Sequence, residues 1–465
     1  MTIPDKKPAC CFPFLIALTF LISRLLFHAM GVRFDASGID WYWQYLDVEL
    51  LKTDLLRSVF YQHSQPPLFN LLLGLVLKCF PTAYAALFAM LFKALSLSLY
   101  YMLFRVLSLL RFKPWIAYLA ATLFMLSPGT VLYENWLFYT WPMAVALTFA
   151  AYQLLLYGQN RRAGNAALYI VAICIICLTR SMFHLVYLVP AVVPLVLMAP
   201  PPRKWIGLAA GLSIVLVTAV FAKNLLLFGF FGSSSWMGMN LWKVVPIGGK
   251  SAQLADSPVA QLEPFSSITD YPDRFQRVPP SFAAIPALAA ECRQNAKPNL
   301  NHFGYIAVSD SYRKKGVELI RADIWGYAGI VLNAWGIYFA PAGSYPLLAS
   351  SNIDALRPYT RITAFADPRW LVPSGLILMV LCFKGGIARQ SPSYPSGGQR
   401  LFFIFCFSTV LYAAILGNLL EHGENMRFRV QTDPLLYLAA LYSIHGILWN
   451  RGSGNRLPEN HGEKV

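Results

Sequence analysis

The residues best suited to chemistry lie together, directly after the first apolar run of the chain. Between Gly31 and Asn70 the sequence carries five carboxylates among aromatic side chains: Asp35, Asp40, Asp47, Glu49 and Asp54. Acidic residues are costly to hold where a chain leaves a membrane, and those found there often have a function. We therefore predict that this stretch holds the active site. The alternative is an amphipathic connector whose acidic face is solvated.

Position separates these carboxylates. Asp35 is nearest to the membrane exit, where a carboxylate could meet a lipid head group. Asp40 and Asp47 are seven residues apart, so a helix through DWYWQYLD would place both on one face.

Three further clusters carry polar residues between apolar runs. Glu134 is the one charged residue of the short segment 128–136. Arg180 lies between two apolar runs, and Arg427 and Arg429 lie in EHGENMRFR before the last run. An arginine can hold a phosphate through two parallel hydrogen bonds, whereas the alternative is ordinary contact with lipid head groups. We expect Glu134 and these arginines to contribute to substrate binding.

The bulk composition is that of a membrane protein. Of the 465 residues, 57% are hydrophobic and only 13% are charged, about half the charged share of an average soluble domain. Several apolar runs reach the length of about 20 residues that crosses a bilayer. The fold class is therefore predicted as an all-α polytopic membrane protein.

About ten transmembrane helices are expected, with a long outer loop between the seventh and the eighth. The predicted spans are 12–31, 84–110, 114–127, 137–157, 166–180, 183–199, 204–228, 370–384, 401–418 and 431–449. They divide the chain into a catalytic module (1–228, with a first outer loop at 32–83), a loop region (229–369) and C-terminal spans with a tail (370–465).

The distribution of basic residues predicts the topology. The net charge of +16 comes mostly from lysines and arginines in short segments between the predicted spans, which is the positive-inside pattern of cytoplasmic loops. The charge therefore reports topology, and nucleic acid is not expected as a partner. Both termini are predicted to be cytoplasmic. This pattern holds only if segment 66–80 does not cross, so we interpret it as an interfacial or re-entrant helix that Ser64 caps.

The long loop is expected to be irregular at first and helical later. Residues 250–300 are rich in Pro, Ser and short polar turns. Beyond them, apolar residues recur at helical spacing from Ile320 to Tyr338. This helix is predicted either to lie on the membrane surface or to pack inside the outer region.

No motif of a soluble enzyme is present: the sequence contains no GxxxxGK[ST], HExxH, GxSxG or DxD. The outer clusters fit one reaction instead. A carboxylate would take the proton from an acceptor hydroxyl that attacks an anomeric carbon. The leaving group would be a lipid phosphate, stabilised by arginines, by a divalent metal ion held by carboxylates, or by both.

At these residues the chain resembles the GT-C glycosyltransferases, a superfamily that includes the protein O-mannosyltransferases and the lipid A aminoarabinose transferase. The resemblance lies in Asp35 and Asp40 after the first span, in HSQPP (with His63 and Gln65) before an apolar helix, and in Glu134. The cluster at Arg427 and Arg429, with Pro434 at the last span, adds to it. The shared features cover roughly residues 1–230 and the last fifty.

The resemblance implies an inverting transfer of a sugar from a polyprenyl or dolichyl phosphate to an acceptor hydroxyl on a lipid, glycan or protein. It implies Asp35 as the catalytic base, with Asp40 as the close alternative. His63, Gln65, Glu134, Arg180, Arg427 and Arg429 would bind substrate, and Asp35 and Glu134 would hold any metal ion. The family's familiar Asp-Glu pair is absent, since Ala36 follows Asp35 and Trp41 follows Asp40.

The expected location is the bacterial inner membrane, with a periplasmic active site. Two other functions fit the same clusters: a transporter or flippase of lipid-linked saccharides, and a polymerase or ligase that joins them. A transporter would place charges at mid-membrane, for which Arg24 and Lys93 are the candidates.

Overall fold

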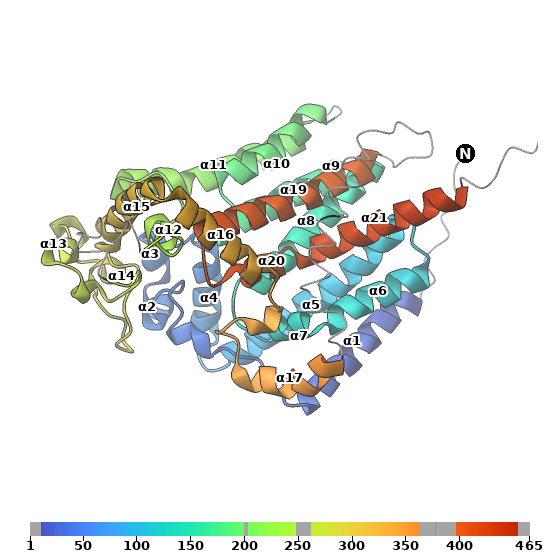
Figure 1. Ribbon diagram of the computed structural model, residues 1–465, viewed down its shortest axis with the longest axis horizontal. Helices are drawn as coiled ribbons and strands as arrows, with labels where there is room; N and C mark the ends of the chain where they lie inside the picture. Colours follow the sequence, from blue (N-terminus) through green and yellow to red (C-terminus); the bar gives the residue numbers. More distant parts are fainter. Residues whose placement is uncertain (1–10, 200–202, 248–261, 363–376, 378–396, 454–465) are drawn as a thin grey trace, which may run out of the picture.

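The architecture is helical wherever the structure describes the chain. The computed structural model describes residues 11–199, 203–247, 262–362, 377 and 397–453, and within them it contains no strand, only two isolated β-bridges. Five helices are long and apolar enough to cross a membrane (Figure 1): α1 (Cys11–Ala29), α5 (Tyr84–Leu109), α8 (Thr140–Asn160), α11 (Lys204–Phe228) and α19 (Gly397–Leu420). This is the architecture of a helical membrane protein.

A bent pair of helices gives a sixth candidate crossing. α6 (Pro114–Leu126) and α7 (Pro128–Glu134) pass the same test together, with a bend of 61° between them. The bend falls where Ser127 precedes Pro128, because a residue before proline is pushed out of the helical region. Ser127 has φ −61° and ψ 141°, and its side chain accepts a hydrogen bond from Thr130 N.

The other predicted crossings are not settled by helix length. α9 (Ala163–Thr179) and α10 (Leu185–Met198) are apolar but shorter, and they form the predicted hairpin around Arg180. α21 (Asp433–Ser453) occupies the last predicted span. The predicted span 370–384 lies outside the described residues, except for residue 377. The number of ten spans therefore stays a prediction.

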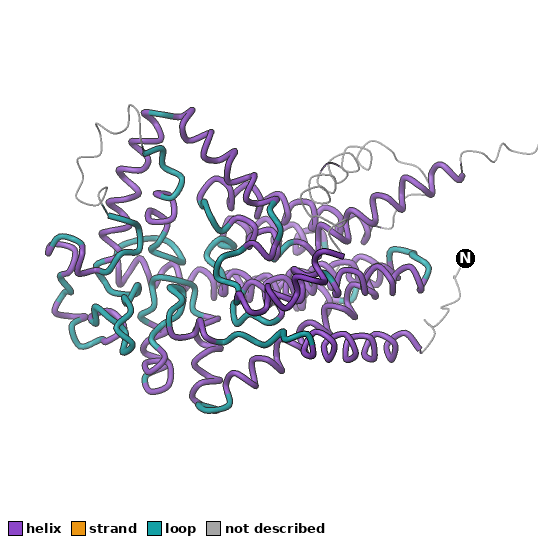
Figure 2. Tube along the Cα trace, turned by 60° about the horizontal axis from the view of Figure 1, so that its bottom comes forward, coloured by secondary structure: helices purple, strands orange, loops and turns teal. Residues whose placement is uncertain are grey.

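The elements sort into a helix bundle and a polar layer at one end of it (Figure 1). The polar layer contains α2 (Val48–Thr53), α3 (Leu55–Phe60), α12 (Met237–Trp242), α13 (Asp273–Gln276), α14 (Pro286–Ala289) and α15 (Tyr305–Ala322). The start of α1 and the end of α21 lie toward the opposite end. Figure 2 shows most of the described loops on the side of the polar layer. The two predicted outer loops thus share one end of the bundle.

α4 (Leu68–Cys79) connects the polar layer to the bundle. Its 12 residues are too few to cross a bilayer core, which needs about 20. It packs against α2 and α3 on one side and against α9 and α5 on the other. Ser64 does not cap it, because the N-cap is Pro67 and no side chain makes a capping hydrogen bond there. The predicted cap was wrong.

The long outer loop packs around its aromatic side chains. Residues 262–300 contain only short helical turns, as predicted, but they complete a buried core with α12 and α15. The predicted helix after residue 320 breaks at Asp323, whose side chain caps α16 (Ile324–Phe339). α16 packs against α19 and α20 (Asn425–Val430) and leaves Trp325 and Leu332 exposed.

A buried ion cluster joins α1, α5 and α7. Glu134 is completely buried, and its carboxylate accepts hydrogen bonds from the guanidinium of Arg24 and from Lys93 Nζ. Lys93 Nζ also donates to Asn135 Oδ1, 2.8 Å away. The two cations that a transporter would require inside the spans are therefore paired with one carboxylate. The cluster fixes the short helix α7 against two long helices.

This cluster predicts a large loss of stability when Glu134 is removed. Glu134→Ala would leave Arg24 and Lys93 without their carboxylate, and breaking a buried pair in this way costs about 3–5 kcal/mol. We expect a clearly lower melting temperature for the purified protein in detergent. Glu49→Ala is the matched control, because Glu49 makes only a half-exposed pair with Lys52 at 3.8 Å. Equal melting temperatures for both variants would contradict a structural role for Glu134.

Candidate functional site

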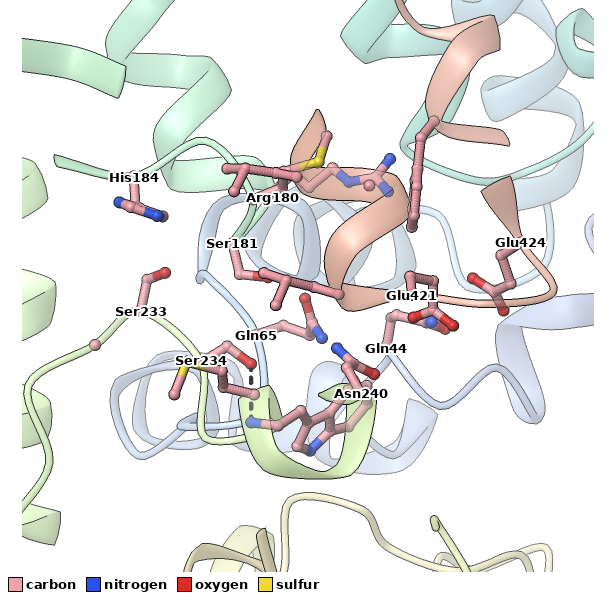
Figure 3. A pocket seen from close by; sticks show the side chains of 18 of the residues that line it. Gln44, Gln65, Arg180, Ser181, His184, Ser233, Ser234, Asn240, Glu421 and Glu424 are labelled. Carbon is pink, nitrogen blue, oxygen red and sulfur yellow. Dashed lines mark hydrogen bonds between the residues drawn. The ribbon is translucent and has the colours of Figure 1, made fainter. Parts of the chain in front are cut away.

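A cavity of about 380 Å³ lies between the polar layer and the helix bundle (Figure 3). Its walls come from the turn between α9 and α10, from α11, from the end of α19 with α20, and from the outer loops. Five charged side chains line it: Arg180, Lys243, Glu421, Glu424 and Arg427. Segments that are distant in the sequence therefore meet at one polar site beside the apolar helices.

Arg180 ends α9 and is almost completely buried in the cavity wall. Its Nη1 donates a hydrogen bond to Gln431 Oε1 at 2.7 Å, and its guanidinium carbon lies 4.4 Å from the ring centre of Phe428. Burial lowers the pKa of Arg180 to about 10, which leaves the side chain charged at neutral pH. A charged group held rigidly against apolar rings is well placed to bind an anion.

Arg427 has hydrogen-bond donors that no described group uses. The side chain is 3% exposed, and its Nη2 donates to the carboxylate of Glu424. Within the described chain, Nε and Nη1 are buried and have no hydrogen-bond partner. Buried donors without partners are costly, and they often mark a place where a ligand binds. Burial opposes the charge, but Glu424 and neighbouring tyrosines raise the pKa of Arg427 above its ordinary value.

The two carboxylates of the cavity differ in their environment. Glu421 accepts a hydrogen bond from Lys243 Nζ at 2.8 Å. Burial and the nearby charge of Glu424 raise the pKa of Glu421 despite this contact. Burial also acts on Glu424, but Arg427, Lys243 and Arg180 together lower its pKa. Two neighbouring carboxylates whose pKa values are pushed apart are typical of acid–base sites.

The charged wall has a surplus of positive charge. Three cations and two carboxylates line the cavity, so one positive charge is left uncompensated when all five groups are ionised. An unbalanced charge on buried side chains is unfavourable. The arrangement therefore favours a ligand with a negative charge.

Of the predicted catalytic residues, neither lines this cavity. The carboxylate of Asp35 accepts hydrogen bonds from Ser37 N and Ser37 Oγ, at 2.9 and 2.6 Å. The backbone of Asp35 pairs with the chain beside Trp136, next to Glu134. Asp40 is exposed and lies at a second, smaller hollow with Arg293.

Stacked aromatic rings connect the Asp35 region to the cavity. The ring of Trp136 stacks on the ring of Phe138, with 4.5 Å between their centres. The guanidinium carbon of Arg427 lies 4.7 Å from the centre of the same Phe138 ring. Tyr42 packs against both rings. Burial, with a smaller effect of the charge on Asp35, raises the pKa of Tyr42 to about 12.

Three of the six predicted substrate-binding residues lie at the cavity, and three do not. Gln65, Arg180 and Arg427 line the cavity. Arg429 does not, because its donors are used by the carbonyls of Tyr338 and Ala340 and by Asp433. Glu134 is held in its ion cluster, and His63 is completely buried and is not part of the lining.

His63 belongs to a buried polar network that connects the loops. Its Nδ1 lies 2.8 Å from Ser235 Oγ, and its backbone N–H donates to Asn301 Oδ1 at 2.9 Å. Burial and the nearby Lys223 lower the pKa of His63 to about 3. The imidazole is therefore neutral at physiological pH, and its contacts stabilise the fold between the first and the long outer loop.

Sequence reasoning missed Lys243 and the neutral side chains Gln44 and Asn240. Glu421 and Glu424 stand in the EHGENMRFR cluster, but the sequence assigned them no role. A signal for Lys243 exists, because it is a single charge in the otherwise uncharged run SSSWMGMNLWKVVP. Nothing in the spacing of Gln44 and Asn240 shows that the fold brings them together.

The residues do not fit a divalent metal ion at Asp35 and Glu134. The carboxylate of Glu134 is already occupied by Arg24 and Lys93. In the part of the chain that the structure describes, no three His, Cys, Asp or Glu side chains gather as metal ligands.

Comparison with known proteins identifies no relative: no family model, no curated protein and no solved structure matches this chain. The functional proposal therefore rests on the cavity itself.

The buried His63 predicts a loss of stability in acid. Its pKa in the folded protein is about 3, below the ordinary value of about 6.5 for unfolded chains. The stabilisation from the neutral form is complete above pH 6.5 and is lost as the pH falls toward 3, which amounts to about 2 kcal/mol by pH 5. We expect His63→Gln to lose less stability than the wild type between pH 7 and pH 5 in thermal melts. The control is His28→Gln, at an exposed position, and a wild-type pH dependence in His63→Gln would contradict the assignment.

Proposed function

We propose that this protein is an inverting glycosyltransferase that moves a sugar from a polyprenyl (or dolichyl) phosphate to an acceptor hydroxyl at the outer face of the membrane. The observation that carries this proposal is the surplus positive charge of a cavity beside apolar helices, with two donors on Arg427 that have no partner among the described residues. A lipid-linked sugar phosphate combines a negative head with an apolar tail. The head matches the positively charged cavity, and the tail matches the apolar helices beside it.

The cations would act mainly on the leaving group. The phosphodiester of such a donor carries one negative charge, equal to the surplus of the cavity. When the bond between the anomeric carbon and the phosphate oxygen breaks, the electron pair stays on the oxygen and the phosphate charge grows to about −1.5 to −2. Arg180, Lys243 and Arg427 would stabilise this growing charge, so their effect would be larger in the transition state than in the bound donor.

Glu421 is the base that the geometry favours. It lines the cavity, and its raised pKa brings it closer to the working pH of a general base. Its carboxylate would take the proton from the acceptor hydroxyl while that oxygen bonds to the anomeric carbon. Asp35, the base implied by the family resemblance, faces its own turn at Ser37 and remains the alternative.

The setting of the proposal is a bacterial inner membrane with the cavity on the periplasmic side. The acceptor would be a lipid, a glycan or a protein. A transporter is less well supported, because Arg24 and Lys93 are engaged with Glu134. A polymerase or ligase of lipid-linked saccharides would use the same chemistry with a larger acceptor.

Substitution of each candidate base shows whether Glu421 or Asp35 takes the proton. Glu421→Gln is expected to lower the turnover number of sugar transfer by about 10²- to 10⁴-fold while the donor still binds, because only proton transfer is lost. The measurement is the initial rate of transfer by purified protein at saturating donor. Asp35→Asn is the comparator. Normal turnover in Glu421→Gln together with loss of transfer in Asp35→Asn would place the base at Asp35.

Substitution of Arg427 tests the phosphate site. Arg427→Gln removes a charged donor set and is expected to weaken donor binding by about ten- to one-hundred-fold, with Arg427→Lys retaining part of it. Arg313→Gln is the matched control, because Arg313 pairs with Asp310 on the surface of α15. Unchanged affinity in Arg427→Gln would contradict the role of the cavity.

A further inference from the structure

The neutral part of the cavity contains three carboxamide side chains that do not take part in the hydrogen bonds of the described fold. Gln44, Gln65 and Asn240 come from three different segments, and Figure 3 shows their side chains pointing toward one another. Within the described chain, none of the three amide groups makes a hydrogen bond to another side chain or to the backbone. Each carboxamide has two N–H donors and one oxygen acceptor.

Hydroxyl groups and aromatic rings line the same cavity as these amides. Ser181 and Ser233 line the same cavity. Trp43 is 43% exposed and lines it as well, and its ring is stacked on Phe265 with 4.7 Å between the centres. A pocket with a rigid ring and a few convergent polar groups is the usual form of a small-molecule site. Hydroxyl-rich ligands match such a mixture of donors and acceptors.

The ion pairs of the cavity and one bound phosphodiester together balance all the charges of the lining side chains. Lys243 compensates Glu421, and Arg427 compensates Glu424, which leaves the charge of Arg180 for the phosphodiester. A cationic amino sugar would add a second positive charge beside this surplus, and among the described residues that line the cavity it would find no free carboxylate. An anionic sugar would compete with the phosphate for the same cation.

We infer that the carboxamide group Gln44, Gln65 and Asn240 binds an uncharged sugar, so that the donor is a neutral hexose or N-acetylhexosamine on a lipid phosphate. The inference rests on the proposed function and specifies its substrate class. It excludes amino sugars with a free ammonium group and uronic acids as preferred donors.

The test compares binding of lipid phosphates with and without a sugar by the purified full chain in lipid nanodiscs. The probes are polyprenyl phosphate, its neutral hexose, its aminopentose and its hexuronate. The wild type is expected to bind all probes through the phosphate and to bind the neutral hexose at least tenfold more tightly than either charged sugar. Tighter binding of a charged sugar would overturn the inference but leave the proposed function intact. Absence of binding of polyprenyl phosphate itself would contradict the proposed function.

Matched variants assign the preference to the amides. Gln65→Leu and Asn240→Leu keep the side-chain size but remove the hydrogen-bonding groups. Each is expected to weaken binding of the neutral hexose donor about tenfold and to leave the affinity for bare polyprenyl phosphate unchanged. Gln276→Leu is the control, because Gln276 lies outside the cavity on α13. If both cavity variants keep the wild-type preference for the hexose donor, the amides are not the sugar site.

Discussion

Buried charges must be paired, and in this protein the pairs join segments that are far apart in the sequence. Glu134 connects α7 to α1 and α5 through Arg24 and Lys93. Lys243 and Glu421 connect the outer loop after α11 to the end of α19. Because an unpaired charge inside a protein is very unfavourable, these contacts restrict how the loops can lie on the helix bundle. The cavity exists where this pairing is incomplete.

Hydrogen-bond pairing distinguishes the residues that stabilise the fold from those available to a ligand. Arg429 and Glu134 have all their partners inside the fold, so they stabilise it. Arg427 is buried equally deeply but keeps two donors without a described partner. Two arginines in the same short helix, two residues apart, therefore have different roles, and only the three-dimensional contacts distinguish them.

The sequence was sufficient for the general architecture. Continuous apolar runs predicted the long helices, and the basic residues in short segments predicted which loops share an end of the bundle. The arginines at the α9–α10 turn and before α21 were recognised because they fall on the predicted outer side, where the positive-inside pattern places few basic residues. Each of these signals depends on local composition, which the sequence displays directly.

The details of the site depend on packing between distant segments, which the sequence does not display. Asp35 was favoured because it follows the first span, but a turn at Ser37 holds its carboxylate away from the cavity lining. Gln44 and Asn240 carry no periodicity or motif, and only the fold brings their amides beside that of Gln65. Glu134 resembled a free loop carboxylate, because its partners lie 110 and 41 residues away.

The central claim is that the buried cations serve the breaking of a bond between a sugar and a lipid phosphate. It is tested most directly by incubating the purified protein with a polyprenyl-phosphate sugar and a panel of hydroxyl acceptors, followed by mass analysis of both products. We expect release of one polyprenyl phosphate for each sugar transferred, with inversion at the anomeric carbon. Movement of the intact donor across a bilayer without cleavage of that bond would contradict it.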